Sequence, residues 1–159
     1  MMFRSYTFSF EEVRPEIPVL MEYLQIPDSE SYVLVAEIVE RTFGELKDSK
    51  EIIGGYRLLD CPEVNVKEGI VNGSSGCLHT GRKISGYMQG ADQIALFLCT
   101  AGKTFTELSH AYQQNSDFLE AFVVESIGSA TVENAMDKVQ LYLEKEMMNQ
   151  GKKIANRYS

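Results

Sequence analysis

The sequence predicts an α+β fold with a mainly antiparallel sheet, packed helices and a long C-terminal helix. Residues 118–149 contain no proline and a single glycine, which is typical of one continuous helix of roughly 45–50 Å. Asn115, Ser116 and Asp117 precede this segment where N-cap residues are expected, and Gly151 follows it where a C-cap glycine is expected. Upstream, strand-like and helix-like segments follow each other without strict alternation, which favours α+β over α/β.

The first third of the chain predicts one strand and two helices. Residues 4–10 alternate polar with aromatic or β-branched side chains, as in a half-buried strand. Two prolines make 14–18 a break before a short helix over 19–24, and 27–29 is a turn with N-cap chemistry. Residues 30–46 predict an amphipathic helix. Its apolar face is Val33, Val35, Ile38, Val39, Phe43 and Leu46.

The middle of the chain is strand-like. Two adjacent glycines in 51–59 indicate a bent or bulged strand, and 67–71 and 79–85 are weaker strand candidates around a loop over 72–76. The nearly continuous apolar run 93–99 predicts a central strand that is buried on both faces.

The turn Thr100-Ala101-Gly102-Lys103 leads into a helix expected over 104–114. Thr104 and Glu107 have the spacing of a capping box, with Thr104 as the N-cap. The turn has two interpretations: a simple tight turn, or an anion site at a helix N-terminus. The simple turn is favoured because the flanking residues of a nucleotide-binding loop are absent from this segment of the sequence.

Length and composition limit the number of domains and the classes of function that the chain can have. A chain of 159 residues is expected to form one domain over 1–159. Its formal charge of −8 argues against general nucleic-acid binding and against attachment to anionic membranes. Three cysteines without short pair spacing predict free thiols and a cytoplasmic location, and no apolar run reaches the length of a membrane span. The N-terminal residues lack the apolar run of a signal peptide, so none is expected.

The sequence contains no recognisable catalytic or metal-binding constellation. Cys77 and His79 follow a glycine-serine loop, but a nucleophilic pair needs an orienting group and an oxyanion site that the sequence does not indicate. His110 is the only other histidine, and no pair has a metal-ligand spacing. We therefore expect no catalytic residues and no metal site.

The middle of the long helix combines small side chains with one carboxylate. The residues before Glu133 are small enough to let a neighbouring backbone or a ligand approach closely; they are Ser126, Gly128, Ser129, Ala130 and Thr131. A following apolar stripe is expected to be mostly core, with an end at Met147-Met148 that is a possible partner surface. The stripe consists of Met136, Val139, Leu143 and Met147.

The segment 125–137 with Glu133, together with Arg157-Tyr158-Ser159, resembles the activation (reactivation) domain of cobalamin-dependent methionine synthase in its stand-alone form. In that family a glutamate on a long helix and an Arg-x-x-x-Gly-Tyr motif bind S-adenosylmethionine, and stand-alone relatives often carry Arg-Tyr-Ser-Pro-Gly-Tyr. The sequence matches the first half of this motif and lacks the Gly-Tyr half. The resemblance therefore implies a domain truncated at its C-terminus, with a twisted antiparallel sheet.

The resemblance also implies a function and two site residues. Glu133 would pair with the ammonium of S-adenosylmethionine, and Arg157 would hold its carboxylate through two hydrogen bonds. The partner would be the cobalamin-binding domain of methionine synthase or a related corrinoid protein. Oxidised cobalamin would be reduced by a flavodoxin-type donor and remethylated from the bound S-adenosylmethionine, so this chain would act as an accessory to a methyltransferase.

Two other functions stay open. The chain could be an acidic, non-enzymatic interaction module that does not bind S-adenosylmethionine, with Glu133 as a solvated helix residue and Arg157 as a terminal charge. A hydrolase that uses Cys77 is the third alternative.

Overall fold

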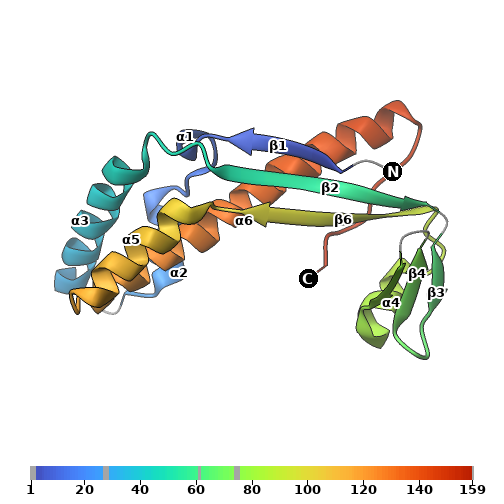
Figure 1. Cartoon of the computed structure of the whole chain (residues 1–159), viewed down its shortest axis with the longest axis horizontal. Helices are drawn as coiled ribbons and strands as arrows, with labels where there is room; N and C mark the ends of the chain where they lie inside the picture. Colours follow the sequence, from blue (N-terminus) through green and yellow to red (C-terminus); the bar gives the residue numbers. More distant parts are fainter. Residues whose placement is uncertain (1–2, 27–28, 61, 74–75, 159) are drawn as a thin grey trace. The chain divides into compact units, whose positions relative to one another are not determined.

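The computed structural model describes residues 3–26, 29–60, 62–73 and 76–158. These residues form six helices and two three-stranded antiparallel sheets, so the α+β class is confirmed (Figure 1). Several predicted features lie outside the described residues: Pro27 and Asp28 of the predicted turn, Cys61, Ser74 and Ser75 of the predicted loop, and Ser159 of the motif.

The larger sheet has the strand order β1-β2-β6, from Arg4–Phe8, Ile52–Asp60 and Gln93–Thr100. The arrows of β1 and β6 run opposite to that of β2 (Figure 1). The prediction of a central strand buried on both faces at 93–99 is wrong, because β6 is an edge strand and Leu98 is 68% exposed. The glycine-containing strand β2 takes the central place instead.

Glycine in β2 has a packing reason. A Cβ at Gly54 would lie 2.9 Å from Val139 Cγ2 and 3.3 Å from Cys99 Sγ. The long helix therefore approaches this strand more closely than a side chain would allow.

The smaller sheet has the order β3-β4-β5, from Glu63–Asn65, Ile70–Gly73 and Gly76–His79. In its registers Val64 pairs with Val71, and Val71 with Leu78. Helix α4, Gly81–Met88, packs against β3 and β4, so the strand predicted over 79–85 is wrong beyond His79. Of the loop predicted at 72–76, Asn72 and Gly73 belong to β4 and Gly76 belongs to β5, so the prediction is wrong at these positions.

The N-terminal part contains three helices. Strand β1 ends at Phe8 rather than at Phe10, because Ser9 begins helix α1, Phe10–Val13. The Ser9 amide and hydroxyl both donate to Glu12 Oε2, at 2.7 and 2.8 Å, and these bonds lower the pKa of the Glu12 carboxyl. Helix α2, Ile17–Leu24, begins two residues earlier than predicted, because a proline is tolerated in the first turn of a helix.

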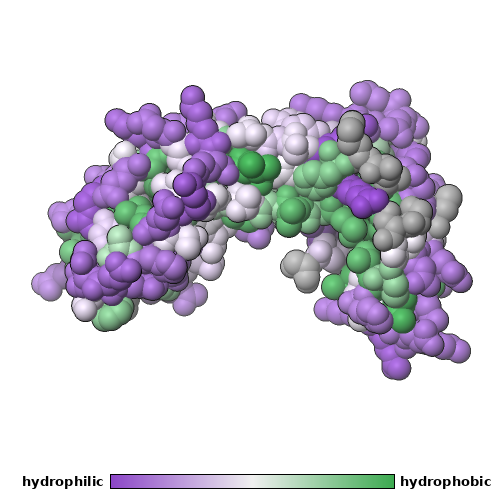
Figure 2. Space-filling view, viewed as in Figure 1, coloured by the Kyte–Doolittle hydropathy of each residue, from purple (hydrophilic) through white to green (hydrophobic). Residues whose placement is uncertain are grey.

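Helix α3, Ser29–Leu46, confirms the predicted amphipathic helix. All of its predicted apolar face is buried except Val33, which is exposed. Hydrophilic side chains cover most of the part of the visible face that α3 and α5 occupy (Figure 2). Helix α5 spans Lys103–Gln114.

Helix α6, Phe118–Asn149, has the predicted boundaries and is continuous over 32 residues. Gly151 is left-handed, with φ of 71°, and its amide donates to Met148 O at 3.0 Å. The Lys152 amide donates to Met147 O at 2.9 Å, which completes a Schellman motif. The predicted stripe is mainly core: Val139, Leu143 and Met147 are buried, Met136 is half-buried and Met148 is exposed.

The chain folds into two compact units. Unit 1 contains residues 1–4, 56–97 and 143–159, and unit 2 contains residues 5–55 and 98–142. The core of unit 2 includes Phe10, Val124 and Ile127, all fully buried. In unit 1, Tyr56 is buried and its hydroxyl donates to Glu146 Oε2, which also pairs with Arg4 at 2.5 Å. Among the described residues, no helix is long and apolar enough to cross a membrane.

Candidate functional site

A surface hollow of about 580 Å³ lies between α5 and α6 in unit 2. Both helices and the turn before α5 contribute to its wall. The lining residues are Ala101, Phe105, Thr106, Ser109, His110, Glu125, Gly128, Ser129, Val132 and Glu133. The hollow therefore contains Glu133 and two of the small residues that the sequence singled out.

Gly128 allows the close approach of the two helices. A Cβ at this position would lie 3.1 Å from Phe105 Cδ1, and the Phe105 ring itself rests on Phe10 with centroids 6.0 Å apart. The small side chains near Glu133 thus admit an aromatic side chain of α5 at this point, and Ser129 remains open on the wall of the hollow.

Glu125 is held in place by α5. Its Oε1 accepts the Ser109 hydroxyl at 2.8 Å and the Gln113 side-chain amide at 3.1 Å. Ser109 is only 3% exposed, so this hydrogen bond fixes the carboxylate at the edge of the hollow.

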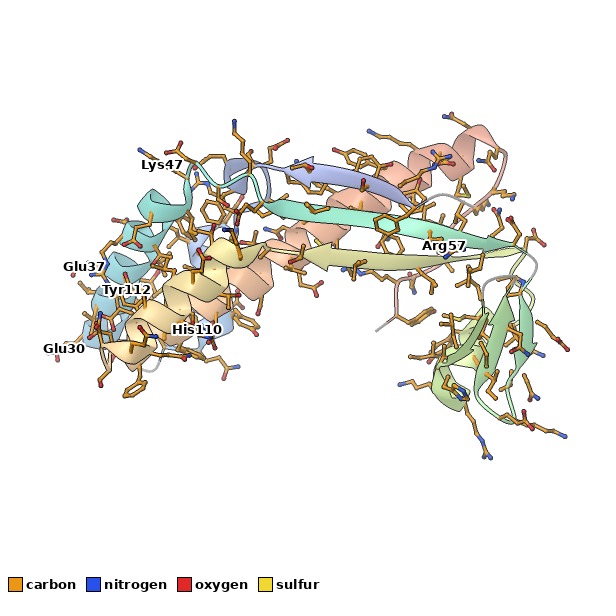
Figure 3. All side chains as sticks on the ribbon, viewed as in Figure 1. Glu30, Glu37, Lys47, Arg57, His110 and Tyr112 are labelled. Atoms are coloured by element: carbon orange, nitrogen blue, oxygen red, sulfur yellow. The ribbon has the colours of Figure 1, made fainter. Side chains whose placement is uncertain are left out.

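Two further α5 side chains, His110 and Tyr112, have different surroundings. His110 lines the hollow, whereas Tyr112 points toward α3, where Arg41 lies 5.9 Å from its ring centroid (Figure 3).

Glu133 lies eight residues after Glu125, at the far end of the same wall, and is exposed. Eight residues correspond to about 12 Å along a helix. Burial raises the pKa of the Cys99 thiol, the Thr100 amide opposes this by hydrogen bonding, and the Glu133 carboxylate raises that pKa further. The Cys99 thiol is consequently protonated at neutral pH, while the two glutamates give the hollow a negative potential.

The turn before α5 is closed by an internal carboxylate. Glu51 Oε2 accepts the Thr104 hydroxyl at 2.8 Å and the Thr104 amide at 3.2 Å, and these bonds lower the pKa of the Glu51 carboxyl. The N-cap is Gly102, with φ of 86°, so the prediction of Thr104 as N-cap is wrong. Glu51 already occupies the N-terminal amides of this helix, which removes the anion-site interpretation of the turn.

Arg157 lies in unit 1 and is half-buried. The next residue, Tyr158, stacks on Tyr87 of α4 with ring centroids 4.5 Å apart and an interplanar angle of 11°. Glu133 belongs to unit 2, so each of the two predicted ligand-binding residues is placed within its own unit.

Cys77 and His79 lie on strand β5, and their Sγ and Nε2 atoms are 3.9 Å apart. Both side chains are exposed, and that separation is at the long end for a hydrogen bond that involves sulfur. Within the described ranges, no group of three or more histidine, cysteine or acidic side chains is arranged to hold a metal ion.

Sequence reasoning missed the α5 side of the hollow. Phe105, Ser109 and His110 line it, but nothing in their local pattern predicts which part of α6 they face. The eight-residue spacing of Glu125 and Glu133 was a readable signal, because residues so spaced share a helix face. A scan of the sequence against protein-family models found no match, and a search of curated proteins found none either.

Proposed function

We propose that this chain binds S-adenosylmethionine and supports the reductive remethylation of a cobalamin held by a partner domain or subunit. The observation that carries the proposal is the hollow between α5 and α6, whose wall bears Glu133 beside the small residues Gly128 and Ser129. The sequence resemblance to the methionine synthase activation domain supplies the ligand.

The charges of the hollow suit this ligand. S-adenosylmethionine carries a sulfonium and an ammonium, and carboxylates attract both groups. Glu133 would pair with the ammonium, while Glu125, fixed by Ser109 and Gln113, adds negative potential without changing position. Arg157 would hold the ligand carboxylate through two parallel hydrogen bonds.

The residues of this chain would bind and orient the methyl donor rather than transfer protons. A cobalamin held by the partner would supply the cobalt chemistry of electron uptake and methyl transfer. The acidic surface would steer the encounter with a basic face on the corrinoid-binding partner. It would act in the same way on the complex that this partner forms with a flavodoxin-type donor.

A second candidate is the acidic interaction module that binds no such ligand. The specific observation in its favour is an apolar start of α6, where Phe118 is 67% and Phe122 is 53% exposed. Exposed aromatic side chains on one helix end are typical of a docking surface.

Calorimetric titration separates the two candidates. Binding of S-adenosylmethionine to the parent protein supports the first, and Glu133→Gln should weaken it about 5- to 30-fold, as expected for an exposed charge-assisted hydrogen bond of about 1–2 kcal/mol. Glu144→Gln, on the same helix but outside the hollow, is the matched control and should bind like the parent.

S-adenosylhomocysteine provides a ligand control. It lacks the sulfonium charge, so it should bind more weakly if the carboxylates attract the ligand. Equal affinity of Glu133→Gln and parent would contradict the assignment of Glu133. Absence of binding to the parent would favour the interaction module.

A further inference from the structure

The segment after α6, residues 152–158, has neither helix nor strand, yet it is attached to unit 1 at both of its ends. At the start, Lys152 Nζ donates to Gln93 Oε1 at 2.6 Å, and the Gln93 amide in turn donates to Asp60. At the end, Tyr158 stacks on Tyr87 in nearly parallel orientation. Arg157 is therefore the neighbour of an anchored residue.

The Tyr87–Tyr158 stack is built from side chains that the core does not require. Tyr87 is 52% exposed, and Ser85 is the only buried residue of α4. A ring that is half exposed and lies flat on another ring contributes mainly to holding that second ring. Its contribution to the stability of unit 1 is small by comparison.

Anchoring the segment has a consequence for binding. A segment without regular structure loses conformational entropy when a ligand orders it, and an anchor made beforehand reduces this loss. The anchor at Tyr158 adjoins Arg157, so it restricts the backbone that carries Arg157 before any ligand arrives.

We infer that Tyr87 is a positioning residue for Arg157: by stacking on Tyr158 it holds the segment in the conformation in which Arg157 receives the ligand carboxylate. This inference rests on the proposed binding of S-adenosylmethionine. It does not depend on Glu133, which lies in unit 2.

Limited trypsin digestion of the ligand-free protein tests the anchor by itself. Cleavage after Lys153, followed by mass spectrometry, should be about 2- to 10-fold faster in Tyr87→Ala than in the parent, the range expected from one aromatic stack. Tyr87→Phe keeps the ring and should be cleaved at the parent rate. Tyr23 is an exposed tyrosine of α2 without such a stack, so Tyr23→Ala is the control for a general increase in cleavage on loss of a tyrosine ring.

Titration with S-adenosylmethionine tests the positioning. Tyr87→Ala should bind about 2- to 10-fold more weakly, with Tyr87→Phe and Tyr23→Ala like the parent. Unchanged cleavage in Tyr87→Ala would overturn the inference, and so would faster cleavage with unchanged affinity. A parent that binds no S-adenosylmethionine would overturn the proposed function and the positioning role together, whereas the digestion would still show whether Tyr87 holds the segment.

Discussion

The substitution Gly128→Ala measures how closely α5 and α6 pack beneath the hollow. In an open helix interior, alanine is more stable than glycine by about 0.5–1 kcal/mol, because glycine loses more backbone entropy on folding. At Gly128 the new Cβ would lie 3.1 Å from Phe105 Cδ1, which is closer than an ordinary van der Waals contact. Phe105 must then move by a few tenths of an ångström.

The surroundings limit that movement. Phe105 is buried and rests on Phe10, which is fully buried. Displacing an aromatic ring from its preferred rotamer by ~30° costs about 0.5–1.5 kcal/mol, so the gain from alanine should be cancelled or reversed. We expect Gly128→Ala to be neutral or destabilising by up to about 1 kcal/mol.

Gly44 of α3 is the matched control, because a Cβ there would meet nothing within 4 Å. Gly44→Ala should stabilise the protein by the full ~0.5–1 kcal/mol, or raise Tm by roughly 1–4 °C for a chain of this size. Urea unfolding followed by circular dichroism gives the free energy of unfolding of both variants. In a Phe105→Leu background, Gly128→Ala should recover its gain, since the smaller side chain removes the close contact. Equal stabilisation by the two alanines in the parent would refute the reasoning.

Three further predictions concern other parts of the structure. Glu51→Ala should reduce the loss of Tm on acidification. The reason is that the lowered pKa of the Glu51 carboxyl provides stability above the pKa of the unfolded state, and this stability is lost as the pH falls through the pKa of the folded state. Glu51→Gln keeps a hydrogen-bond acceptor and should retain more of the Tm at pH 7. Iodoacetamide should label the exposed Cys77 faster than Cys99 at pH 8, because the raised pKa of Cys99 keeps its thiol protonated. Peptide mass spectrometry measures the two labelling rates, and equal rates would contradict the burial of Cys99. Tyr56→Phe should lower the free energy of unfolding in urea by about 1–3 kcal/mol, because it removes a buried donor to Glu146. A free energy of unfolding equal to that of the parent within error would show that the bond contributes nothing.

Local chemistry predicted the helix boundaries well where capping residues are present in the sequence. The residues before Phe118 and the glycine at 151 mark both ends of α6, and the left-handed Gly151 explains why the second mark was reliable. The Ser9-x-x-Glu12 pattern is an equally readable capping box, and it places the start of α1 correctly.

Tertiary pairing explains the errors in the sheet region. An apolar run indicates burial but does not say which strand lies in the middle, and β2 is central although its glycines weaken its apparent strand propensity. Helix α4 has an amphipathic period but is only eight residues long and buries only Ser85, and a segment so short is not separated from a strand by its pattern alone. Its packing on β3 and β4 determines its structure.

The site was only partly readable for the same reason. Glu133 could be singled out from a resemblance and from its small neighbours, whereas the Ser109–Glu125 bond depends on how α5 meets α6. The contact of Glu51 with Thr104 joins residues 53 positions apart, and a capping box within the helix looked equally good from local spacing.

Strands β2 and β6 are neighbours in the sheet, and the side chains of Asp60 and Gln93 bond at the point where the chain leaves one and enters the other. The residues between them, with their own small sheet and α4, are therefore topologically an insertion into a β-hairpin. A shorter connection could replace them without altering the order of the larger sheet, so this is a position where such a chain can gain or lose length. Any lineage that lost the insertion would also lose Tyr87, and with it the restraint on the segment that carries Arg157.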